Sequence, residues 1–163
     1  MLSQLEAYFA AEKAESLVFM AFGLCAVAFS LFALWRLRDP LFKGMAIPLL
    51  VVGLIQAVVG ATVYTRTDAQ VAALKAQYEA APTSFKTQEL ARMDRVGRSF
   101  TVYKIVEAMF IVVGLALALM RRARRFWRGF GLGMLLQGAL MLPADLLAED
   151  RAAAYVRQIE AMP

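Results

Sequence analysis

The sequence predicts an all-α membrane protein: an up-down-up-down four-helix bundle of long helices, with four transmembrane spans and a helical extension projecting outside the membrane. Two observations lead to this fold class. Of the 163 residues, 61% are hydrophobic and only 19% are charged, whereas a soluble domain is usually about half apolar and about a quarter charged. In addition, four apolar stretches are each long enough to cross a bilayer, which takes about 20 helical residues.

The four predicted spans are residues 16–35, 44–65, 99–120 and 126–147. The fourth span is the weakest prediction because it contains Gln137, Pro143 and Asp145. The first span is preceded by three glutamates rather than by a basic cluster, and it is too long for the apolar region of a signal peptide. We therefore expect it to be a true span.

Lysine and arginine are concentrated in two short turns, which predicts the orientation. Turns 36–43 and 121–128 together hold 8 basic residues and one acidic residue, whereas the remainder holds 10 basic and 12 acidic residues. Basic residues are typical of cytoplasmic loops. We therefore expect a multi-pass protein of the bacterial inner membrane, with both turns in the cytoplasm and both termini in the periplasm. Such a cluster can also bind nucleic acid, but five arginines between two spans are better explained by topology, so no nucleic-acid partner is expected.

The segments beyond the spans are expected to continue the helices. Segment 61–81 contains no glycine or proline, and its residues TDAQVAALKAQYEAA are strong helix formers. The chain, a single domain over 1–163, is thus predicted to form helices over about 2–38, 41–80, 84–122 and 126–161. The short turns between them make sequential helices antiparallel. Segments of about 1–15, 66–98 and 148–161 then form the outer extension.

Inward-facing positions recur at alternating spacings of three and four along the second and third helices, as left-handed bundle packing requires. On the third helix this predicted seam consists of Met93, Val96, Phe100, Tyr103, Glu107, Phe110, Gly114 and Leu117. Within the spans, small residues occupy the expected contact positions, where they allow helices to approach closely. These small residues are Gly53, Ala57, Gly60, Gly114, Gly129 and Gly133.

Ionisable groups inside a span are costly and are therefore candidates for function. Lys104 and Glu107 lie three residues apart in the third span, and Asp145 lies at a similar level in the fourth. Four further polar residues are expected to join them: Tyr64, Tyr103, Gln56 and Gln137. Together they could line a polar cavity for an ion, a proton or a lipid headgroup. The favoured alternative is a structural ion pair of Lys104 with Glu107 or with Asp145.

The composition removes many enzyme classes. The sequence has no histidine and one cysteine, Cys25, and it contains no phosphate loop, dinucleotide fingerprint or metal-ligand spacing. No catalytic residue, metal site or cofactor is therefore expected. We predict a non-enzymatic accessory or partner-binding subunit of a bacterial cell-envelope complex, which contacts the lipid bilayer and, through its extension, a protein partner or a second copy of itself. The alternative is a small oligomeric transporter or channel using the Lys/Glu/Asp cluster, and an enzyme acting on lipid or quinone is the least favoured.

Overall fold

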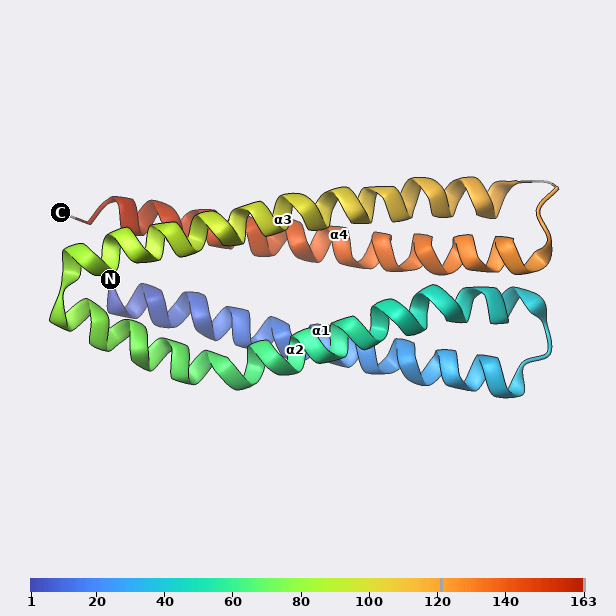
Figure 1. Cartoon of the computed structure of the whole chain (residues 1–163), viewed down its shortest axis with the longest axis horizontal. Coiled ribbons are helices and arrows are strands. Elements are labelled where there is room, and N and C mark those ends of the chain that lie inside the picture. Colours follow the sequence, from blue (N-terminus) through green and yellow to red (C-terminus); the bar gives the residue numbers. More distant parts are fainter. Residues whose placement is uncertain (121, 163) are drawn as a thin grey trace.

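The computed structural model describes residues 1–120 and 122–162, so Arg121, one of the arginines of the second basic turn, lies outside the described residues. Within them the chain forms four long helices: α1 Leu2–Arg36, α2 Pro40–Ala80, α3 Pro82–Leu119 and α4 Arg125–Glu160. The helices run alternately up and down, so that both termini lie at the same end as the α2–α3 turn (Figure 1). The predicted all-α up-down bundle is confirmed.

The turns are short because local chemistry stops one helix and starts the next. Asp39 is the N-cap of α2, and its side chain accepts a hydrogen bond from the backbone N–H of Leu41 at 3.0 Å. Pro40 and Pro82 occupy the first positions of α2 and α3, where a proline loses no helical hydrogen bond. Only Ala81 separates α2 from α3. Each pair of sequential helices is therefore antiparallel.

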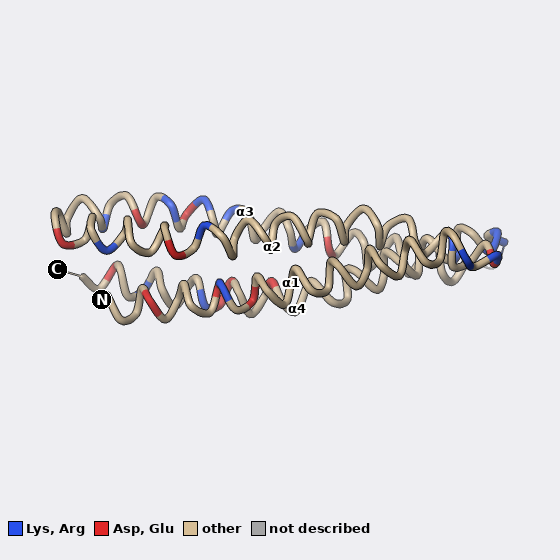
Figure 2. The backbone as a smooth tube through the Cα atoms, turned by 90° about the horizontal axis from the view of Figure 1, so that it is seen from below, with Lys and Arg blue, Asp and Glu red and all other residues tan. Residues whose placement is uncertain are grey.

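Exposed large apolar side chains are confined to one half of the bundle. Among the described residues they fall within 17–35, 42–64, 102–120 and 127–147. These ranges lie close to the four predicted spans, and all four helices are long and apolar enough to cross a membrane. We call this part the apolar half. Charged residues cluster on either side of it, with few inside it (Figure 2).

In the apolar half the four helices form a single layer, in the order α3, α4, α2, α1 (Figures 1 and 2). The contact between α2 and α4 holds the two hairpins together there, and glycines make it close. A Cβ atom added to Gly129 would lie 1.9 Å from the carbonyl oxygen of Leu41, and one added to Gly44 would lie 2.0 Å from that of Phe126. Backbone thus packs directly on backbone.

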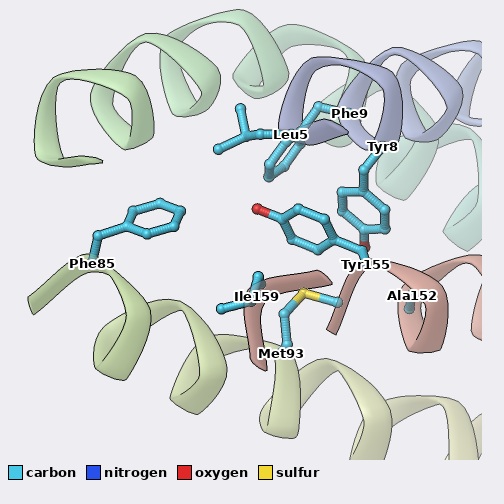
Figure 3. Close-up of a cluster of buried hydrophobic side chains, with 8 residues drawn as sticks. All are labelled: Leu5, Tyr8, Phe9, Phe85, Met93, Ala152, Tyr155 and Ile159. Carbon is cyan, nitrogen blue, oxygen red and sulfur yellow. The ribbon is translucent and has the colours of Figure 1, made fainter. Parts of the chain in front are cut away.

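At the other end the layer opens into two levels, with α2 and α3 on one level and α1 and α4 on the other (Figure 2). We call this part, residues 1–15, 66–98 and 148–162, the helical extension. Its core is built of apolar side chains from α1, α3 and α4 (Figure 3): Leu5, Tyr8, Phe9, Phe85, Met93, Ala152, Tyr155 and Ile159. The helical extension therefore has the apolar interior of a soluble bundle, whereas the apolar half carries its large apolar side chains outside.

Candidate functional site

The seven polar residues singled out in the sequence lie at different levels of the bundle. Gln56 of α2 and Gln137 of α4 are buried within the apolar half. Nε2 of Gln56 donates to Oε1 of Gln137 at 3.2 Å and to Sδ of Met141 at 2.8 Å. Oε1 of Gln56 is buried without a hydrogen-bond partner among the described residues. The two amides therefore form a polar link between the hairpins.

Ionisable residues from α3 and α4 meet closer to the helical extension. The carboxyls of Glu107 and Asp145 lie close enough for the charge of one to act on the other, and Oε2 of Glu107 is buried with no hydrogen-bond partner among the described residues. Nζ of Lys104 lies 2.7 Å from Oε1 of Glu149. The expected pairing of Lys104 with Glu107 or Asp145 is therefore wrong.

The antiparallel packing of α3 and α4 explains this partner. On α3, Lys104 lies three residues before Glu107 and is closer to the helical extension. On α4, which runs in the opposite direction, Glu149 lies four residues after Asp145 and is also closer to the helical extension. Each step is about one helical turn, so Glu107 is level with Asp145 and Lys104 is level with Glu149.

The two tyrosines of the predicted set lie apart from these contacts. Tyr64 is 37% exposed, and Nζ of Lys13 lies 4.8 Å from the centre of its ring. Tyr103 was expected on the inward seam of its helix, but it is 52% exposed. Because α3 lies at the edge of the layer, with α4 as its main neighbour, only one face of α3 is covered, and Tyr103 lies off that face.

Charged groups also connect the helices where the apolar half meets the helical extension. Glu15 of α1 pairs with Arg151 of α4, and Nη2 of Arg66 on α2 lies 3.9 Å from Oε1 of Glu12 on α1. Burial raises the pKa of Glu12, and the positive charge of Arg92 opposes this shift. Oε2 of Glu12 is buried with no hydrogen-bond partner among the described residues. The charge of Glu12 is therefore only partly compensated.

Sequence reasoning missed the most buried charged group of the helical extension. The side chain of Glu89 on α3 is 1% exposed. Both of its oxygens accept hydrogen bonds from Arg92, each at 2.8 Å, and Oε1 also accepts one from the hydroxyl of Tyr155 on α4 at 3.0 Å. A signal was available: the predicted seam of α3 begins at Met93, and one more step of four residues back reaches Glu89.

Aromatic side chains contact both members of the ion pair of Glu89 with Arg92. Tyr155 stacks on Tyr8 of α1 at 4.4 Å between ring centres, and the guanidinium of Arg92 lies 5.3 Å from the centre of the Phe9 ring. Figure 3 shows Tyr8 and Tyr155 side by side. Burial raises the pKa of Tyr8 to about 12, and burial followed by the negative charge of Glu89 raises the pKa of Tyr155. Both tyrosines therefore stay neutral at physiological pH.

The hydrogen bonds of Glu89 link α3 to α4, and α1 joins them through the stacking of Tyr8 on Tyr155. In the described residues, no group of three or more His, Cys, Asp or Glu side chains gathers at metal-binding distances.

Comparisons with known proteins found no match: no family model, no curated protein and no solved structure is significantly similar to this chain.

Proposed function

We propose that this chain is an integral protein of the bacterial inner membrane that acts through contacts, as an accessory or partner-binding subunit of a cell-envelope complex. The observation that carries the proposal is the reversal of packing along the bundle. Large apolar side chains are exposed in the apolar half and buried in the helical extension. The first arrangement suits lipid and the second suits water.

The helical extension is the part of the molecule suited to bind a partner. Residues 66–80 of α2 continue past the apolar half for 15 residues, or roughly 22 Å at about 1.5 Å per residue. Ion pairs hold its helices together, among them Lys13 with Asp68 at 2.6 Å and Lys75 with Glu6. A surface that is already ordered loses less conformational entropy on binding. Its partner is a protein of the envelope or a second copy of the chain.

The orientation is tested by cysteine labelling. In a Cys25→Ser background, Ala76→Cys places a thiol on the helical extension, and Ala123→Cys places one in the second basic turn. Treating intact spheroplasts with an impermeant maleimide should label position 76 and leave position 123 unlabelled until the membrane is opened. Labelling of position 123 alone would reverse the orientation, and labelling of both in intact spheroplasts would contradict membrane insertion.

The partner is tested by site-specific photocrosslinking in native membranes. A photoreactive amino acid at the exposed positions Ala73 and Glu79 samples the helical extension, and one at Val112, which is 67% exposed, samples the apolar half. We expect one stoichiometric product, of the same mass from both extension positions and absent from Val112. Correctly inserted protein without a product at either extension position would contradict the proposal.

A small oligomeric transporter is the second candidate, and the carboxyl pair of Glu107 and Asp145 favours it. Four spans are few for a transport route, so at least a dimer would be needed. Proton or cation flux into proteoliposomes, measured for the wild type and for Glu107→Gln with Asp145→Asn, distinguishes the two functions. We expect no flux in either form. Flux in the wild type that is lost in the variant would establish transport.

A further inference from the structure

The end of the bundle opposite the termini carries an unbalanced positive charge. Seven described basic residues are exposed there: Arg36, Arg38, Lys43, Arg122, Arg124, Arg125 and Arg128. Asp39 is the only acid in the two turns, and it is already occupied by Arg125 at 2.8 Å and by the N-terminus of α2. In the described part of the chain, none of the other six has a carboxylate within ion-pair distance. We call this surface the basic end.

Exposed tryptophans border the basic end on the side of the apolar half. Trp35 at the end of α1 is 85% exposed, and Trp127 at the start of α4 is 49% exposed. They are the only two tryptophans in the chain. Tryptophan concentrates at the level of lipid headgroups because its ring is apolar while its N–H needs a polar partner. The tryptophans thus place the arginines beside them at headgroup level.

We propose that the basic end binds the phosphate headgroups of anionic phospholipids, and this proposal rests on the membrane location argued above. Arginine holds phosphate through paired N–H donors. A cluster of basic residues directly beside a span is the arrangement that recruits anionic lipid. Because Asp39 is already bound, the complementary negative charge comes from outside the chain. A bilayer places a layer of phosphates at this level, whereas a soluble partner would have to displace them.

The two tryptophans make the test local to this surface. The protein is reconstituted into vesicles of equal parts phosphatidylglycerol and phosphatidylcholine, in which either one lipid or the other carries brominated acyl chains. Bromine quenches tryptophan fluorescence only at close range, so the ratio of the two quenching efficiencies gives the relative affinity for the two lipids. Trp35 and Trp127 are the only reporters.

We expect phosphatidylglycerol to be favoured at least about fivefold at low salt, the factor that one basic side chain near an anionic surface supplies. The preference should decline towards one in 0.5 M NaCl, where screening extends only a few ångström. It should also fall in R38Q/R122Q/R124Q. The matched control R95Q/R98Q/R157Q removes the same number of exposed charges from the helical extension and should leave the preference unchanged.

Each outcome separates the two proposals. No quenching by either brominated lipid overturns the membrane location itself. Equal quenching by both lipids, or a preference that survives R38Q/R122Q/R124Q, overturns anionic-lipid binding while leaving the membrane location intact. Loss of the preference on adding soluble glycerol phosphate at the lipid concentration would reassign the basic end to soluble phosphate compounds.

Discussion

Replacing Arg92 by methionine tests whether the buried carboxylate of Glu89 depends on its ion pair. The substitution keeps the aliphatic length of the side chain and removes both hydrogen bonds to Glu89. The carboxylate then stays 1% exposed, with only the hydroxyl of Tyr155 as a partner. The change thus isolates the cost of an uncompensated charge inside the helical extension.

The expected loss of stability is about 3 kcal/mol. Removing one partner of a buried pair costs about 3–5 kcal/mol, and the low end applies because the Arg92 side chain is itself 21% exposed.

Hydrogen exchange measured by mass spectrometry, on protein in nanodiscs, follows this loss locally. A loss of about 3 kcal/mol corresponds to roughly 150-fold faster exchange of the protected amides in segments 85–93 and 152–159. Adding Glu89→Met and Tyr155→Phe to Arg92→Met gives a triple variant with no buried charge at this position, and it should recover most of the protection. The control Arg98→Met removes an exposed pair with Asp94 and should leave exchange unchanged. Exchange rising less than about fivefold in Arg92→Met, or a triple variant no better than the single one, would refute the reasoning.

Three further predictions follow from close contacts elsewhere in the bundle. Gly129→Ala should separate the two hairpins and lower the melting temperature in detergent, because its Cβ would meet a backbone carbonyl of α2. Gly97→Ala, with nothing within 4 Å of its Cβ, should raise stability by about 0.5–1 kcal/mol. A melting temperature that is higher for Gly129→Ala than for Gly97→Ala would contradict the packing. Gln56→Leu should lower the free energy of unfolding by about 1 kcal/mol, and adding Gln137→Leu should restore it. An unchanged thermal unfolding of Gln56→Leu would show that the amide link contributes nothing to stability. Because the pKa of Glu12 is higher in the folded state than in the unfolded state, its contribution to stability is complete below the unfolded-state pKa and is lost as the pH rises through the folded-state pKa. Glu12→Gln should therefore be more stable than the wild type at pH 7 but not at pH 4. An equal difference in stability at both pH values would rule out this linkage.

The tertiary structure decided which polar groups meet. Lys104 has two acids within reach on α4, Asp145 and Glu149, one turn apart, and the choice between them depends on how far α3 is shifted along α4. Close backbone contacts set that shift. For example, a Cβ atom added to Gly138 would lie only 2.8 Å from the carbonyl oxygen of Glu107. A periodic pattern carries no information on an axial shift between two helices.

The edge position of α3 was equally hidden in the sequence. A seam with spacings of three and four assumes neighbours on both sides of a helix, which placed Tyr103 inside. In the layer of the apolar half, α3 is covered mainly by α4, so this tyrosine is exposed. The order of the helices across the layer follows from the glycine contact between α2 and α4. The sequence pattern of one helix does not show which other helix its glycines pack against.

By itself, the sequence determined the number, length and type of the helices and the position of the apolar half. Uninterrupted apolar runs leave a helix as the way to satisfy the backbone, and Pro40, Pro82 and the N-cap Asp39 mark where two of the helices begin. The buried carboxylate of Glu89 needed the tertiary structure, because Arg92 supports it from its own helix but Tyr155 reaches it from α4. Local pattern sets which face of a helix is buried, whereas the groups that meet across that face depend on the register between helices.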